Sequence, residues 1–322
     1  MSYAGTSAQP IDELEVGAPR SFRALRRLIR RPVAVVAVCV ILIIYLAGIL
    51  APLAAPQGFR ETDLRNPFAG PSIDHPLGTD RLGRDLLSRA MWSAQTTVII
   101  SIASVTSGGL VLGVSLGLLA GYARGAVDSV IMRLADFFAA VPTILLLLMI
   151  NVSLKDRVIA WSRDIEDFTG FEGLTDSGAP DYFLVATALG IFGWVGIARL
   201  VRSQTLSVRE SNYIFAARAS GASTARVLFR HLLPNLTNLL VVAITLSLGA
   251  AAGLEIGLTF LGIGVHAPHP SFGIMIEDGA GLTTLRAHPI LMAVPAVVVA
   301  SLLLSFNLLG DVLTDVLSPR RR

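Results

Sequence analysis

The sequence predicts an all-α integral membrane protein with six transmembrane helices, and three observations lead to this prediction. First, 53% of the 322 residues are hydrophobic and only 15% are charged, whereas about a quarter of the residues are charged in soluble domains. Second, the apolar residues form runs close to the about 20 residues that cross a bilayer. Third, arginines gather on one side of the membrane once these runs are threaded through it.

Six apolar runs qualify as spans, and polar connections separate them. Proline marks several of their limits: Pro52 and Pro56 close the first run, Pro142 interrupts the third, and Pro295 lies near the start of the sixth. The second run is rich in serine and glycine, which allow close helix approach, so we expect it inside the bundle. The predicted spans are about 33–53, 96–121, 130–152, 182–201, 236–263 and 290–309.

Arginine placement orients these spans. If the arginine-rich stretch before the first span is cytoplasmic, six spans return Arg320–Arg322 to the same side. The connection between the fourth and fifth spans is then cytoplasmic too, and most acidic residues lie outside. The sequence therefore predicts a cytoplasmic tail at 1–32, a membrane domain at 33–311 and a second cytoplasmic tail at 312–322. The N-terminal stretch has no signal-peptide cleavage pattern, so the first span is expected to remain as an anchor.

The outer connections are predicted at 54–95, 153–181 and 264–289. The second is acidic and carries Trp161, Phe168 and Phe171. It is either a solvated connector or a contact surface for an extracytoplasmic partner, because exposed aromatic residues are unusual in a linker. The single cysteine, Cys39, lies in an apolar run and is expected to be a buried, inert thiol.

The cytoplasmic segment Glu210–Asn235 is too polar to span and too regular to be a plain loop. It reads ESNYIFAARASGASTARVLFRHLLPN. We predict a short helix, a left-handed turn at Gly221, and a second helix that is capped by Ser223 and stops at Pro234. The turn is lined by small residues, which favour insertion into a cleft of another protein. An interfacial amphipathic helix with lipid-facing arginines is the alternative.

This segment resembles the "EAA" loop of ABC importer permeases, whose pattern is E-A-A, three residues, glycine, and a longer gap that ends in proline. Ala216, Ala217, Gly221 and Pro234 match its spacing, and Phe215 replaces the glutamate. Residues 75–89 (HPLGTDRLGRDLLSR), 260–264 (FLGIG) and 306–315 (FNLLGDVLTD) resemble further segments of one branch. That branch is the C-type membrane subunit of the dipeptide, oligopeptide and nickel permease family.

The resemblance implies a type I ABC importer permease of the bacterial cytoplasmic (inner) membrane that moves di- or oligopeptides; nickel or another small solute is the alternative. The implied partners are a second permease subunit in a heterodimer, two ABC ATPase subunits, an extracytoplasmic binding protein and the lipid bilayer, with no nucleic acid. The chain has no phosphate-binding loop, so it is expected to be non-catalytic and to bind no cofactor or metal, with ATP and Mg in the ATPases. The residues expected to couple to the ATPase are Phe215, Ala216, Ala217, Arg218, Ala219, Ser220, Gly221 and Ala222.

A few polar residues outside this segment invite separate predictions. Glu255 lies deep in an apolar span and either lines the translocation pathway or makes a polar contact within the bundle, for example with Thr259. Asp136 is expected to pair with Arg133. The H-x-x-H pattern in the Pro-rich outer connection lacks the further ligands that a metal site needs.

The charged residues before the second span have the spacing of an amphipathic helix at the outer surface. We expect them to pair with a neighbouring subunit rather than with substrate. They are Asp80, Arg81, Arg84, Asp85 and Arg89.

A transporter working alone would show inverted repeats or several intramembrane charges, and an intramembrane enzyme would need a catalytic constellation. Neither pattern is clear in this sequence.

Overall fold

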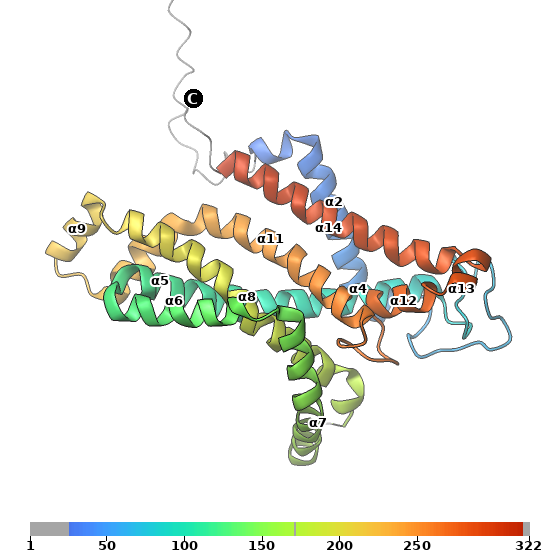
Figure 1. Ribbon diagram of the computed structural model, residues 1–322. Coiled ribbons are helices and arrows are strands. Elements are labelled where there is room, and N and C mark those ends of the chain that lie inside the picture. The colour runs from blue at the N-terminus through green and yellow to red at the C-terminus, as the bar shows by residue number, and fades with distance from the viewer. Residues whose placement is uncertain (1–25, 171, 318–322) are drawn as a thin grey trace, which may run out of the picture.

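The computed structural model describes residues 26–170 and 172–317 as a bundle of long helices, with no strand in these ranges (Figure 1). Its first half contains α2 (Pro32–Ile49), α3 (Ala51–Ala54), α4 (Leu86–Ser104), η1 (Val105–Val114), α5 (Ser115–Ala123), α6 (Gly125–Ala140) and α7 (Thr143–Thr169). Its second half contains η2 (Thr175–Ser177), α8 (Ala179–Val208), α9 (Asn212–Ala219), α10 (Thr224–Arg226), η3 (Val227–Leu232), α11 (Leu233–Phe260), α12 (Phe272–Gly279), α13 (Leu282–Ala287) and α14 (Ile290–Leu317).

Five of the described helices are long and apolar enough to cross a membrane, and a bent pair brings the number to six. Two of them are longer than predicted because consecutive helices join: α4, η1 and α5 form one helix over Leu86–Ala123, and α10, η3 and α11 form another over Thr224–Phe260. The fourth span is also longer than predicted, since α8 covers Ala179–Val208. The last span, α14, also continues to Leu317, past the expected start of the C-terminal tail. The all-α membrane fold is thus confirmed.

The third predicted span, 130–152, is divided between two helices at Pro142. The chain bends by 87° between α6 and α7. Val141 is extended there (φ −96°, ψ 133°), because the residue before a proline avoids the helical region. α6 has 16 residues and is about 24 Å long, which is shorter than the about 30 Å hydrocarbon core. α7 then leaves the bundle nearly at a right angle (Figure 1).

Much of the predicted outer connection 153–181 is therefore helical, because α7 continues to Thr169. Mostly apolar residues recur along α7 at alternating intervals of three and four positions. This pattern is typical of a helix seam that packs on a neighbour. Leu147 and Val158 of this seam are buried, whereas Trp161 is 58% and Phe168 92% exposed. The complete seam is Ile144, Leu147, Asn151, Leu154, Val158, Trp161, Ile165 and Phe168.

Glycines allow the second span to pack closely against α8, as predicted. A Cβ atom added to Gly117 would lie 2.6 Å from the Ala198 carbonyl oxygen, and one added to Gly121 would lie 2.7 Å from Thr205 Cβ. Gly108 and Gly113 also leave no room for a Cβ atom against α8, although they are five residues apart rather than four. The π-helical winding of η1 explains this spacing, since it places residues five apart on one face.

Two smaller predictions are corrected by the packing. Cys39 is exposed rather than buried, because α2 turns Ala34 and Ala37 toward the bundle. Asp136 pairs with Arg199 of α8 at 2.7 Å rather than with Arg133.

The charges of residues 80–89 do not form one amphipathic helix, since α4 begins at Leu86 with Asp85 as its N-cap. They pair within the chain, where Arg89 bridges Asp80 at 2.7 Å and Asp278 of α12 at 3.0 Å. We call Asp80, Arg84, Arg89 and Asp278 the outer ion cluster.

Candidate functional site

The predicted coupling residues 215–222 lie together on a tight turn at one end of the bundle, opposite α12 and α13 (Figure 1). α9 ends there because Gly221 has a φ of +78°, which glycine adopts without strain. The Gly221 amide donates to the Arg218 carbonyl at 2.9 Å, and the Ala222 amide donates to the Ala217 carbonyl at 3.0 Å. The left-handed turn predicted from the sequence is confirmed.

The next helix begins as predicted but does not stop at Pro234. The Ser223 hydroxyl accepts a hydrogen bond from the Arg226 amide at 3.4 Å and caps α10. Pro234 lies in the first turn of α11, directly after the π-helical η3. The helix therefore runs without a break from Thr224 to Phe260. Residues 215–222, which we call the coupling turn after their predicted role, are joined to a transmembrane span with no loop between them.

One side of this segment is anchored in the bundle. Ile214, Val227 and Leu232 have no exposed surface and pack in one cluster with Val201 of α8 and Leu118 of α5. Burial of each such aliphatic side chain stabilises the anchored arrangement by about 1.5–3 kcal/mol. The Arg218 guanidinium lies 4.7 Å from the centre of the Tyr122 ring, a cation–π contact with the end of α5.

The other side of the turn is open. Phe215 is 54% exposed, and Ala216, Ala219, Ser220 and Gly221 are exposed with it, whereas Ala217, Arg218 and Ala222 are half-buried. A Cβ atom added at Gly221 would meet no atom within 4 Å. The eight predicted residues thus form one small surface on which only Phe215 and Arg218 are large.

Glu255 lies in α11 with no exposed surface. Its carboxylate accepts hydrogen bonds from Thr97 of α4 at 2.9 Å, Ser271 at 2.8 Å and Thr259 at 3.2 Å. It therefore joins α4 and α11 to the connection that precedes α12. Hydroxyl donors satisfy the buried carboxylate, which is what a polar contact within the bundle requires.

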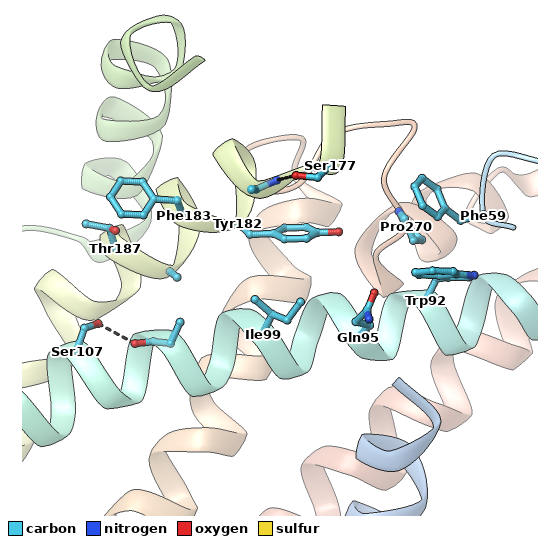
Figure 2. Close-up of a pocket in the computed structure, with 13 residues that line it drawn as sticks. Phe59, Trp92, Gln95, Ile99, Ser107, Ser177, Tyr182, Phe183, Thr187 and Pro270 are labelled. Atoms are coloured by element: carbon cyan, nitrogen blue, oxygen red, sulfur yellow. Dashed lines mark hydrogen bonds between the residues drawn. The ribbon is translucent and has the colours of Figure 1, made fainter. Parts of the chain in front are cut away.

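A groove lies between α4 and α8 toward the end opposite the coupling turn, and the sequence did not reveal it (Figure 2). Its volume is about 610 Å³. We call it the outer groove; it is lined by Phe59, Trp92, Gln95, Ile99, Ala103, Ser107, Ser177, Ala179, Tyr182, Phe183, Ala186, Thr187 and Pro270. Its lining residues on α4 recur every three or four positions, which the sequence shows. The sequence does not show that α8 faces them across the groove.

Side chains from two connections lie at the outer end of this groove. Phe59 packs edge-on against Trp92 with ring centres 5.2 Å apart, and His269 lies 5.7 Å from Phe59 and 6.2 Å from Tyr182. Arg60 donates to the Asp176 carbonyl at 2.5 Å, which ties the first outer connection to the second. Among the described residues, no three or more His, Cys, Asp and Glu side chains form a group that could hold a metal.

Comparison with known proteins agrees with this architecture. The family described as "binding-protein-dependent transport system inner membrane component" matches residues 113–322, and the N-terminal transmembrane domain of oligopeptide transport permease C matches residues 22–71. The oligopeptide permease protein OppC of Bacillus subtilis is 33% identical over 93% of this chain and 89% of its own. The dipeptide permease protein DppC of the same organism is 31% identical, over 93% and 85%.

A third relative extends the range of named substrates. The glutathione transport system permease protein GsiD of Pectobacterium atrosepticum is 34% identical over 92% of this chain and 89% of its own. Both matched families and the full-length relatives therefore lead to one conclusion. This chain is a multi-pass membrane protein that belongs to the binding-protein-dependent permeases of ABC importers, in the oligopeptide and dipeptide permease C branch.

Proposed function

We propose that this chain is one membrane subunit of an importer that carries short peptides across the bacterial cytoplasmic (inner) membrane. It forms a heterodimer with a second permease subunit and receives peptides from an extracytoplasmic binding protein. Two separate ATPase subunits, which hold ATP and Mg, bind at the coupling turn, and the chain itself is non-catalytic. The names of the relatives support the substrate class, since oligopeptides, dipeptides and glutathione are all peptides.

The observation that carries this proposal is the unbroken helix behind the coupling turn. An ATPase that moves against Phe215 and Ser220 displaces a turn that is anchored through Ile214 and Val227. Because the helix continues to Phe260, the displacement reaches the membrane-spanning part of α11 without loss in a flexible joint. Rocking of α11 against α4 and α8 then alternates access to the two sides of the membrane.

Reconstitution of the complete complex tests this function. Proteoliposomes that contain both permeases, both ATPases and the binding protein should accumulate a labelled dipeptide only when ATP is present on the cytoplasmic side. Transport by this chain alone, or transport that is independent of ATP, would overturn the proposal.

The coupling turn is tested by the substitution Gly221→Trp. The indole adds bulk to the open surface, so we expect the chain to insert normally but to lose peptide-stimulated ATPase activity and uptake. Gly221→Asn is the matched control, because asparagine tolerates a positive φ and stays small. Uptake at the wild-type rate in Gly221→Trp, or equal loss in both variants, would contradict docking at this surface.

A further inference from the structure

We propose that the outer groove binds an apolar or aromatic side chain of the transported peptide together with its peptide bond. This inference rests on the function proposed above and assigns it a substrate contact.

The shape of the outer groove suits such a ligand. One side is a helical face of α4 and η1 that runs from Trp92 to Ser107, and its α8 side is a facing stripe that runs from Ala179 to Thr187 (Figure 2). The volume of about 610 Å³ falls within the range of about 300–1,000 Å³ for small-molecule sites. A peptide side chain and its neighbouring backbone fit this space.

The lining chemistry favours neutral groups. The aromatic rings of Phe59, Trp92, Tyr182 and Phe183 surround the groove, and none of its 13 lining residues is charged. Aromatic faces bind apolar and aromatic side chains through area burial and ring contacts. Without a fixed charge, the groove can accept side chains of different kinds and release them again.

Two polar groups in the groove are free to bind a ligand. Within the part of the chain that the structure describes, the Gln95 carboxamide and the Thr187 hydroxyl make no hydrogen bond. By contrast, the Tyr182 hydroxyl lies 3.1 Å from that of Thr96, and the Ser107 hydroxyl donates to the Ala103 carbonyl at 2.8 Å. A carboxamide both donates and accepts, so Gln95 matches the C=O and N–H of a peptide bond.

The same free groups indicate that lipid tails do not fill the groove. Hydrocarbon offers no hydrogen bond, so an unpaired carboxamide and hydroxyl that faced it would be costly. Water or a peptide satisfies both Gln95 and Thr187. The geometry therefore points to the aqueous pathway rather than to the lipid-facing surface.

Uptake by the complete reconstituted importer tests the aromatic contact. The measurement is the ratio of Phe-Ala to Ala-Ala uptake, and the same binding protein is used throughout so that its own selectivity cancels. Phe183 is 58% exposed, so Phe183→Ala should fold, and we expect the ratio to fall about fivefold.

Gln95→Leu should lower uptake of both dipeptides equally, because both contain the same peptide bond. Val36→Ala, on the exposed face of α2, is the control and should leave the ratio unchanged.

Photocrosslinking identifies what occupies the groove. With p-benzoylphenylalanine in place of Phe183, a labelled dipeptide should crosslink during ATP turnover, and the same group at Val36 should capture none. Crosslinks to lipid or to the second permease alone, or an unchanged uptake ratio in Phe183→Ala, would overturn the inference. If the wild-type complex imports no dipeptide at all, the proposed function fails instead, so the two failures are distinguishable.

Discussion

Glu255 illustrates how a single charged residue is accommodated within the bundle. Three hydroxyl groups from different parts of the chain donate to its carboxylate. Each hydroxyl loses its acceptor if the carboxylate is removed, and a buried donor without an acceptor costs about 1–3 kcal/mol. Glu255 is thus a cross-link between α4, α11 and the connection before α12.

Substitution of Glu255 should separate acceptor capacity from charge. Glu255→Leu removes the acceptor to which the hydroxyls of Thr97, Thr259 and Ser271 donate, so we expect a lower melting temperature for the purified complex. Glu255→Gln keeps an acceptor oxygen and should melt closer to the wild type. A Glu255→Leu complex as stable as the wild type would show that these hydrogen bonds contribute nothing. If both variants melt normally but neither transports, the carboxylate lines the pathway instead.

His269 should make the outer end of the bundle sensitive to acid. It is 8% exposed, and burial, together with the nearby charge of Arg60, lowers the pKa of its imidazole. The unfolded chain therefore binds a proton more readily than the folded chain. Stability from this group is complete above the unfolded pKa of about 6.5 and is lost as pH falls through the folded pKa.

The measurement is the melting temperature of the complex at pH 7.5 and pH 5.5. His269→Phe keeps a ring against Phe59 and Tyr182 but cannot titrate, so it should lose less stability on acidification than the wild type. An identical loss in both proteins would assign the acid sensitivity to other groups.

At the scale of elements, the outer ion cluster fastens the start of α4 to α12. Asp80 has no exposed surface and Arg89 is 3% exposed, so these charges are stabilised by their ion pairs and by the Leu82 and Arg84 amides that donate to Asp80. Breaking a buried ion pair by removing one partner costs about 3–5 kcal/mol. The cluster therefore fixes the first outer connection against α4 and α12.

Two arginines that contact the same acid provide a matched test of this cluster. Arg89 pairs with Asp278 in the interior. Arg81 lies at the surface, with 62% of its side chain exposed, and its guanidinium is 3.3 Å from the Asp278 carboxylate. We expect Arg89→Met to lower the melting temperature of the complex clearly and Arg81→Met to have little effect, because exposed pairs contribute about 0–1 kcal/mol. Equal effects of the two substitutions would contradict the role of burial.

The bend between α6 and α7 shows the limit of reading elements from hydropathy. Pro142 indicated an interruption, but not whether the chain would kink and continue or turn aside. The charged residues after Val152 suggested a connection, although they occupy only one face of a helix whose other face carries the seam from Ile144 to Phe168. A search for three- and four-residue spacing beyond the apolar run would have found α7.

At the scale of the whole molecule, the predicted orientation can be tested with single cysteines. The native thiol is exposed on α2, so Cys39→Ser is the background. We expect an impermeant maleimide to label Ile73→Cys, which is 99% exposed in the outer connection, in intact spheroplasts. Ser220→Cys on the coupling turn should react only after the membrane is opened. The reverse pattern would invert the topology.

The sequence by itself determined the membrane class, the approximate spans, the coupling turn and the family. These properties depend on local composition and spacing: a long apolar run must enter the bilayer, and a glycine after a short helix sets the turn at Gly221. Each can be recognised without knowledge of what lies opposite in space.

Only the tertiary structure decided which side chains meet. Asp136 and Arg199, Arg89 and Asp278, and the two walls of the outer groove are distant in sequence, so no local pattern predicts their contact. The same holds for Pro234, which should stop an isolated helix but is accommodated in the first turn of α11 behind the wider turns of η3. Such outcomes depend on how the helices pack against one another, and packing is a property of the assembled bundle rather than of any one segment.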